Sequence, residues 1–151
     1  MLEVGAKPED FTLQDQDGND VPWSSFRGRP VVVFFYPKAS TPGCTTEACA
    51  FRDLSGEFDK RGVAVVGVSA DTVKRQANFA TKYELNMPLL ADTERAILEP
   101  WGVWAEKKNY GKTYMGIVRS HFIIDEEGKI ADTQYKVSPT DSVARAVDAL
   151  S

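Results

Sequence analysis

The stretch that decides the fold of this chain runs from Val31 to Cys49 and reads VVVFFYPKASTPGCTTEAC. It begins as a continuous apolar run over residues 31–36, which is typical of a strand buried on both faces in a mostly parallel sheet. Pro37 ends this strand, a polar loop follows, and Pro42-Gly43 leads into a helical pattern. The sequence therefore predicts a buried strand, a loop and a helix, with Cys44 in the first turn of the helix.

That position favours a reactive thiolate at Cys44. The first turn of a helix has backbone N–H groups without partners and carries the positive end of the helix dipole. Both stabilise a negative charge on sulfur, so Cys44 is a candidate nucleophile. The alternative is that Cys44 and Cys49 are two small apolar residues of the core.

The spacing of the two cysteines limits how they can pair. Residues five apart on an α-helix differ by roughly 7.5 Å of rise and about 140° of rotation, which separates their Cα atoms by about 8.5–9 Å. A disulfide requires Cα atoms within roughly 7 Å, a condition that a C-x-x-C pair meets at about 5 Å. Cys44 and Cys49 therefore either never pair or pair only after the first turns of the helix unwind.

The pattern Pro37-x-x-x-Thr41-x-x-Cys44 resembles the active-site signature of peroxiredoxins. The longer run from Tyr36 to Asp53 resembles the bacterioferritin-comigratory, or peroxiredoxin Q, branch, in which a second cysteine typically follows five residues after the first. The likeness continues through Tyr110-Gly111-Lys112 and Arg119-Ser120…Phe122-Ile123-Ile124-Asp125, so it covers nearly the whole chain.

This resemblance implies a thioredoxin-like α/β fold and a thiol peroxidase that acts on hydrogen peroxide and organic hydroperoxides. Cys44 would attack the peroxide and become a sulfenic acid. The Thr41 hydroxyl would accept from the peroxide and donate to the thiolate or the developing oxyanion, and Arg119 would bind the peroxide oxygens and favour the thiolate. Cys49 would resolve the sulfenic acid as an intramolecular disulfide, which thioredoxin or a similar dithiol would reduce.

The same resemblance assigns supporting roles around the nucleophile. Pro37 and Pro42 would shape the loop, and Pro42 would also shield the sulfur from water. The N–H groups of Gly43 and Cys44 would point at the substrate, as helix N-termini do for anions. Glu47 suits the first turn of the helix, where it either holds the intact site by hydrogen bonding or acts only as a structural cap. No cofactor and no metal is expected.

Four other interpretations compete with this one. A cysteine hydrolase needs a Cys–His pair, and His121, the only histidine, falls on the same strand face as Arg119. We expect it instead to be a packed or hydrogen-bonded strand residue. A thiol–disulfide oxidoreductase would carry C-x-x-C, which is absent, and one histidine with two cysteines does not complete a zinc site. A non-catalytic thioredoxin-like redox-sensing or binding module would leave Thr41 and Arg119 without a joint explanation.

Composition sets the remaining expectations. The 151 residues, 42% apolar and 26% charged, suit one domain over residues 1–151 with a sizeable core. The net charge of −4 argues against a nucleic-acid surface. No apolar run has the length of a signal peptide core or a membrane span, so we expect a cytoplasmic protein. We expect a monomer, or a weak dimer through the loops near the active site.

The rest of the chain predicts a mixed sheet with helices on both faces and an N-terminal hairpin. Phe11–Leu13 and Val21 flank a turn-rich cluster, and one helical turn follows at 23–28. The other predicted elements are a helix over about 44–60, a strand over 63–69, a helix over about 72–84 capped by Asp71, an edge or connecting segment over 87–92, a brief helix over 94–100, a loop over 105–116, a strand over 117–124 paired with 129–135, and a final helix capped by Ser138.

Overall fold

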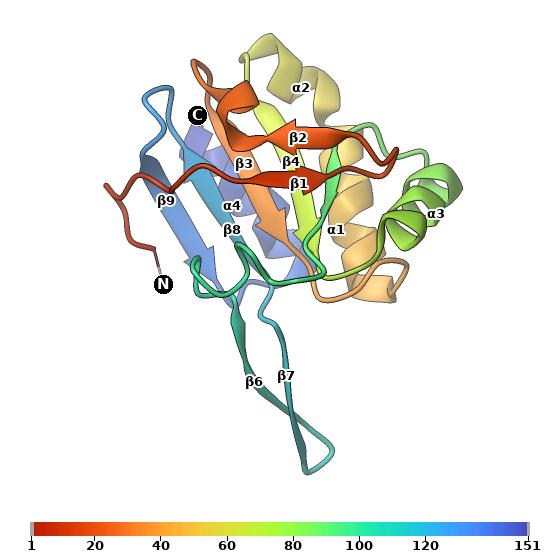
Figure 1. Ribbon diagram of the computed structural model, residues 1–151. Helices are drawn as coiled ribbons and strands as arrows, with labels where there is room; N and C mark the ends of the chain where they lie inside the picture. The colour runs from red at the N-terminus through yellow and green to blue at the C-terminus, as the bar shows by residue number, and fades with distance from the viewer. Residues whose placement is uncertain (1, 151) are drawn as a thin grey trace.

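The structure, a computed structural model of the chain, describes residues 2–150. Within this range a seven-stranded mixed sheet has the order β2-β1-β5-β4-β3-β8-β9, and β6 and β7 form a separate two-stranded hairpin (Figure 1). The strands are β1 (Thr12–Gln14), β2 (Asp20–Pro22), β3 (Val31–Phe35), β4 (Ala64–Ser69), β5 (Leu89–Ala91), β6 (Trp104–Asn109), β7 (Lys112–Ile117), β8 (Ser120–Ile124) and β9 (Ile130–Tyr135). The helices are the 3₁₀ helix η1 (Trp23–Phe26), α1 (Pro42–Asp53), α2 (Ser55–Lys60), α3 (Val73–Tyr83) and α4 (Pro139–Leu150).

Strand β3 lies in the middle of the sheet because all five of its residues are apolar and buried. It pairs in parallel with β4 and antiparallel with β8, which places Phe34 opposite both Gly67 and His121. A Cβ atom at Gly67 would lie 2.8 Å from the Phe34 ring, so glycine makes room for that ring. The predicted buried strand, the N-terminal hairpin β1–β2 and the mixed sheet are confirmed.

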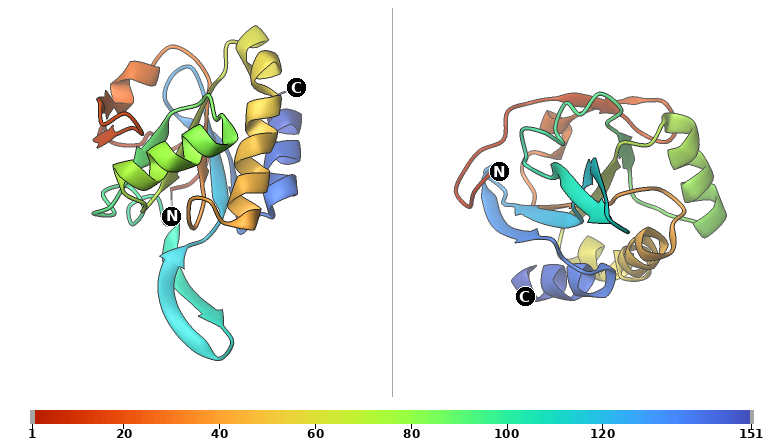
Figure 2. Two further views of the ribbon diagram at one scale, coloured as in Figure 1. Left: turned by 90° about the vertical axis from the view of Figure 1, so that its right-hand side faces the viewer. Right: turned by 90° about the horizontal axis from the view of Figure 1, so that it is seen from below.

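The four α-helices pack on one face of the sheet. Figure 2 shows α1 and α2 in line with each other and α4 beside them, with α3 at their flank. Their apolar side chains, among them Ala48, Phe51, Phe79 and Val143, form one core cluster with the sheet residues that face them. The predicted cap of α4 is present, because the N–H of Asp141 donates to the Ser138 hydroxyl at 3.1 Å.

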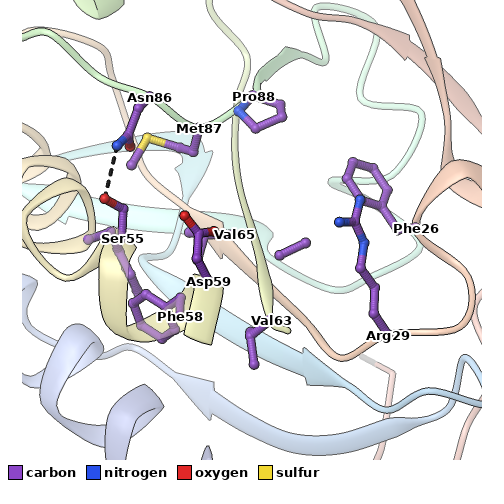
Figure 3. A pocket seen from close by; sticks show the side chains of 12 residues that line it. Phe26, Arg29, Ser55, Phe58, Asp59, Val63, Val65, Asn86, Met87 and Pro88 are labelled. Atoms are coloured by element: carbon purple, nitrogen blue, oxygen red, sulfur yellow. Dashed lines mark hydrogen bonds between the residues drawn. The ribbon is translucent and has the colours of Figure 1, made fainter. Parts of the chain in front are cut away.

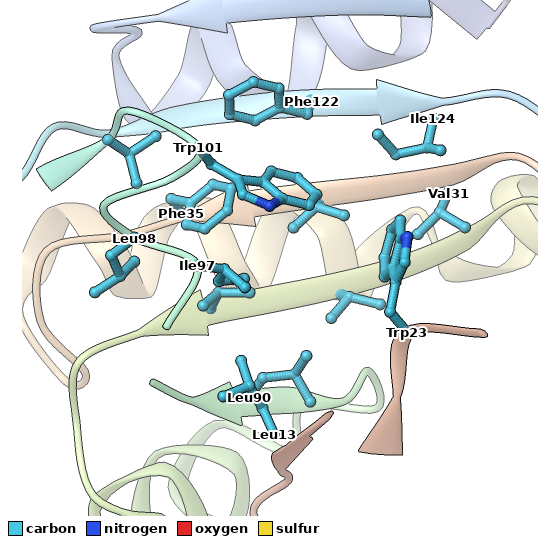
Figure 4. Packing of buried hydrophobic residues seen from close by; sticks show 14 of the residues in the cluster. Leu13, Trp23, Val31, Phe35, Leu90, Ile97, Leu98, Trp101, Phe122 and Ile124 are labelled. Atoms are coloured by element: carbon cyan, nitrogen blue, oxygen red, sulfur yellow. The ribbon is translucent and has the colours of Figure 1, made fainter. Parts of the chain in front are cut away.

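The opposite face is covered by η1 and by the turns between β5 and β6, rather than by an α-helix. A second core cluster fills this side, where Trp23 and Trp101 meet edge to face at 5.7 Å and Trp101 also packs on Phe122 (Figure 4). The brief helix predicted over 94–100 is wrong. These residues form turns, since the Asp92 carboxylate accepts the N–H groups of three consecutive residues, 96–98, and holds the chain there.

The predicted loop over residues 105–116 is also wrong. These residues form the β6–β7 hairpin, which projects from the body of the protein (Figure 1). Its two turn residues, Tyr110 and Gly111, have φ values of 51° and 77°, and such turns match the right-handed twist of paired strands. The hairpin packs little against the sheet, so its residues are mostly exposed and lack the apolar alternation that identifies a strand.

Three further details differ from the prediction. The helix expected over about 44–60 begins at Pro42 and is interrupted at Leu54, where α2 takes over. The segment 87–92 is not at an edge: β5 pairs with both β4 and β1, and Pro88 precedes the strand and removes none of its N–H donors. The cap of α3 is Thr72, whose hydroxyl accepts from Arg75 at 3.2 Å, and not Asp71.

Candidate active site

Cys44 is buried in the first turn of α1, directly after the loop that follows β3. Thr41 is the residue that precedes this helix, yet its side chain does not cap it. Its hydroxyl instead donates to the carbonyl of Lys38 at 2.7 Å. A capping threonine would bond the N–H of the second or third helical residue, here Gly43 or Cys44. Because that bond is not made, these two N–H groups remain available to an anion or a polar ligand.

Arg119 reaches the sulfur from a different part of the sheet. It lies in the two-residue gap between β7 and β8, because the strand predicted over 117–124 is broken at Val118 and Arg119. Its Nη2 donates to Cys44 Sγ at 3.4 Å, and its Nη1 donates to Glu47 Oε1 at 2.7 Å. A Cβ at Gly43 would lie 3.1 Å from Nη2, so the glycine leaves room for the guanidinium to approach the helix.

Glu47 is a fully buried carboxyl one turn after Cys44. Burial raises its pKa to about 7, although the nearby Ser142 hydroxyl and the Arg119 guanidinium oppose the rise. The second carboxyl oxygen, Oε2, has no hydrogen bond of ordinary geometry within the described residues. For Arg119, burial acts to lower the pKa, but Glu47 and Cys44 outweigh it and raise the pKa above its usual value. Glu47 thus holds the guanidinium against the sulfur.

A buried polar network that the sequence did not reveal holds the loop between β3 and α1. The Asp71 carboxylate accepts the N–H of Ala39 at 2.7 Å and the hydroxyl of Ser69 at 2.8 Å. Gln76 on α3 donates to the same hydroxyl at 2.9 Å and bonds the phenol of Tyr36 through its oxygen. The only sign of this network in the sequence is Asp71 after β4, and an acidic residue at that position is equally typical of a helix cap.

Cys49 lies on the same uninterrupted helix as Cys44. It is half-buried and packs against the core cluster beneath the α-helices. Both thiols are free. Both thiols can be free because residues five apart on an intact α-helix have Cα atoms too far apart for a disulfide.

His121 does not form a Cys–His pair in this structure. It is fully buried on β8, and its Nδ1 lies 3.1 Å from the Ser142 hydroxyl on α4. Burial lowers the pKa of the imidazole to about 4; the charge of Asp132 opposes this shift, and the charge of Arg145 adds to it. The ring is therefore neutral near pH 7, as expected of a packed strand residue.

An open cavity of about 1000 Å³ lies beside the guanidinium. Pro37, from the loop between β3 and α1, lines the cavity together with residues of β6, of the β7–β8 gap, of the end of β9 and of the segment before α4. These residues are Glu106, Lys107, Lys108, Val118, Arg119, Tyr135, Lys136, Val137 and Ser138. Another hollow, of about 220 Å³, lies between α2 and the segment before β5 and is bridged by Asn86 and Ser55 (Figure 3). It contains none of the predicted site residues.

The described residues 2–150 hold no group of three or more His, Cys, Asp or Glu side chains that could bind a metal ion. In the same range no helix has the length and apolar character needed to cross a membrane. The Cys44 thiol lies between the N-terminus of α1 and the Arg119 guanidinium, an arrangement suited to nucleophilic attack on an electron-poor atom.

Comparison with known proteins identifies the family. Residues 4–133 match the AhpC/TSA family. The chain is 49% identical over 144 residues to a putative peroxiredoxin of Mycobacterium tuberculosis, covering 95% of this chain and 92% of that protein. It is 43% identical over 149 residues to peroxiredoxin Bcp of Bacillus subtilis, covering 99% and 95%.

A solved structure of the bacterioferritin comigratory protein of Xanthomonas campestris is also similar. It superposes with a TM-score of 0.90 at 37% sequence identity, covering 99% of this chain and 96% of the other. The thioredoxin-like α/β fold and the family expected from the sequence are confirmed by these matches. The chain belongs to the AhpC/TSA family and is a peroxiredoxin, an enzyme that reduces peroxides by means of a thiol.

Proposed function

We propose that Cys44 is the peroxidatic cysteine. Its thiolate attacks the terminal oxygen of a hydroperoxide, an S–O bond forms, and the O–O bond breaks. The sulfur loses two electrons and becomes a sulfenic acid, while the alkoxide or hydroxide that leaves takes up a proton. The single observation that carries this proposal is the Arg119 Nη2 contact with Cys44 Sγ at 3.4 Å, in the first turn of α1.

The residues around the sulfur have separate tasks in this step. Arg119 and the N–H groups of Gly43 and Cys44 stabilise the charge that develops on the peroxide oxygens. The Thr41 hydroxyl donates its hydrogen bond to the backbone carbonyl of Lys38, so its oxygen is free to accept a hydrogen bond from the hydroperoxide. Pro37 and Pro42 shape the loop, and Glu47 positions the guanidinium.

Cys49 acts in the second step as the resolving thiol. Its thiolate attacks the sulfenic sulfur of Cys44, an S–S bond forms, and hydroxide leaves and is protonated to water. Since both residues lie on intact α1, the first turns of this helix must unwind before the two sulfurs meet. A dithiol such as thioredoxin then returns two electrons and restores both thiols.

The other expectations follow from this cycle. Organic hydroperoxides join hydrogen peroxide as substrates, supported by the cavity beside Arg119 and by the alkyl peroxide reduction named for the Xanthomonas protein. A dithiol reductant of this kind goes with a cytoplasmic location, where thiols are kept reduced. We further propose that residues 1–151 act as one domain and as a monomer, or as a weak dimer.

The test is stopped-flow reaction of the reduced protein with hydrogen peroxide, followed by tryptophan fluorescence and then by titration of thiols. The wild type should show a fast second-order phase and lose both thiols into one intramolecular disulfide. The Cys44→Ser variant should lose turnover, whereas Cys49→Ser should complete about one turnover and stall as a sulfenic acid. Multiple thioredoxin-driven turnovers by Cys44→Ser would refute the assignment. A sluggish reaction without a disulfide would favour a redox-sensing or binding module.

A further inference from the structure

Lys107 is one of the residues that line the cavity beside Arg119. It lies on β6, the first strand of the projecting hairpin (Figure 1), and it is half-buried although Glu106 and Lys108 beside it are exposed. Its Nζ donates to the backbone carbonyl of Ile117 at 2.9 Å. This bond fixes the end of a side chain that is otherwise flexible.

The hairpin makes room for this side chain. Gly116 lies on the neighbouring strand β7, and a Cβ there would be 3.2 Å from Cδ of Lys107. The lysine stem therefore crosses the hairpin where the partner strand has no side chain. The Lys107 side chain therefore has a fixed position, unlike a freely solvated lysine on the surface.

The Lys107 ammonium has no counter-ion among the described residues. Across residues 2–150 no carboxylate lies within ion-pair distance of it. Burial lowers the pKa of the ammonium, the charge of Arg119 lowers it further, and the Cys44 thiolate acts in the opposite direction. The ammonium thus lies within electrostatic reach of both the guanidinium and the reactive sulfur, and an added negative charge would stabilise it.

The cavity around Lys107 has the chemistry of a site for an anion with an apolar body. Four of its lining residues are cations and one, Glu106, is an acid, in a chain whose net charge is −4. Val118 and Val137 add apolar wall beside these charges. Pockets of this type bury the apolar part of a ligand and orient it through a few charged groups.

We propose that Lys107 binds a carboxylate on the peroxide substrate and makes the enzyme prefer hydroperoxides that carry an acid on an apolar body. The peroxide oxygens bind Arg119 and the first turn of α1, the carboxylate binds Lys107, and the apolar body lies against Val118 and Val137. This assignment rests on the proposed function, because it places the substrate at Cys44.

The experiment compares two hydroperoxides that differ in charge and are otherwise closely similar in shape. They are cumene hydroperoxide with a carboxylate in the para position and the methyl ester of the same compound. Second-order rate constants are measured by stopped flow for the wild type, Lys107→Met, Lys107→Arg and Lys112→Met. Lys112 is the matched control, since it is an exposed lysine on the same hairpin that does not line the cavity.

The readout is the ratio of the acid rate to the ester rate. The wild type should favour the acid, and Lys107→Met should lower the ratio by about tenfold, the value of one charge-assisted hydrogen bond. Lys107→Arg should keep most of the preference and Lys112→Met all of it. A purely structural role of Lys107 would slow acid and ester equally, so an unchanged ratio in Lys107→Met would overturn the proposal. Equal rates of the wild type with the acid and with the ester would also overturn the proposal.

A binding measurement separates this proposal from the proposed function. The reduction product, the para-carboxylate of cumyl alcohol, contains no peroxide and binds without reaction. Calorimetry should show that it binds the wild type more tightly than Lys107→Met, by the same factor of about ten. If the wild type reduces no peroxide, the proposed function is wrong. If the wild type and Lys107→Met bind the product equally tightly, the proposed role of Lys107 is wrong.

Discussion

The guanidinium of Arg119 and the sulfur of Cys44 lie 3.4 Å apart, although 75 residues separate them in the chain. The contact forms because Arg119 occupies a break between two strands, and because Gly43 leaves space at the start of α1. The other arm of the guanidinium is fixed by buried Glu47. The cation is therefore positioned before any substrate binds, which lowers the reorganisation that the reaction requires.

The first prediction concerns this cation. Arg119→Met should slow the reaction with hydrogen peroxide by about 100-fold or more, the usual effect of removing one preorganised donor at a developing anion. Arg119→Lys should be intermediate, because an ammonium is a point charge that cannot bond sulfur and carboxylate side by side. Stopped-flow rate constants at pH 7 give the result. Arg145→Met, at an exposed arginine of α4, is the control, and equal rates for it and Arg119→Met would contradict the role.

The second prediction concerns the acceptor at Thr41. Thr41→Val removes the oxygen that receives the hydroperoxide hydrogen, so the rate should fall by about 100-fold, whereas Thr41→Ser should retain most of it. Thr46→Val serves as the comparison, since the Thr46 hydroxyl bonds the Pro42 carbonyl on the exposed side of the same helix. Stopped flow measures the peroxide rate constants of the three variants. Equal rates for Thr41→Val and Thr41→Ser would show that the Thr41 hydroxyl does not accept the hydroperoxide hydrogen.

The third prediction follows from the raised pKa of Glu47, about 7 against an ordinary 4.5. Between these values the folded protein holds a proton that the unfolded chain releases, so this group lowers the free energy of unfolding as pH rises from about 4.5 to 7. The Glu47→Gln variant has no titrating carboxyl at this position, so its free energy of unfolding does not decrease for this reason. The stability of Glu47→Gln relative to wild type should therefore increase by up to about 3 kcal/mol from pH 4.5 to 8.

Urea unfolding at a series of pH values measures this difference. His121 acts with the opposite sign, since its lowered pKa of about 4 makes stability rise with pH up to 6.5, the ordinary pKa of histidine. It is present in both proteins and cancels in the comparison. A stability difference between variant and wild type that does not change with pH would show that Glu47 is not buried as a titrating carboxyl.

The fourth prediction concerns the loop before α1. Asp71→Ala removes the acceptor for the Ala39 N–H and the Ser69 hydroxyl, and should reduce the free energy of unfolding by about 1–3 kcal/mol. The loop would lose its anchor, so the peroxide reaction should also slow. Arg75→Met removes only the exposed 3.9 Å ion pair of the same carboxylate and should cost less than about 1 kcal/mol. Equal effects of both variants on the reaction rate would argue against a positioning role for Asp71.

The sequence by itself determined the local structure around the nucleophile. A run of five buried apolar residues forms β3, Pro37 ends the apolar run, and Pro42 starts α1 with Cys44 in its first turn. The separation of the two thiols also follows from the sequence, because five residues on a helix have one geometry. These features depend on neighbours in the chain, so periodicity and breaker residues were sufficient to predict them.

Only the tertiary structure decided which distant groups meet. The hairpin β6–β7 is stabilised by cross-strand pairing without a buried face, so its sequence lacks the alternation of a packed strand. The internal place of β5, the use of Asp71 by the loop and the contacts of Arg119 with Cys44 and Glu47 depend on sheet order and on the end of β7. Such contacts join residues up to 75 positions apart, and packing of the whole core, rather than any local pattern, brings them together.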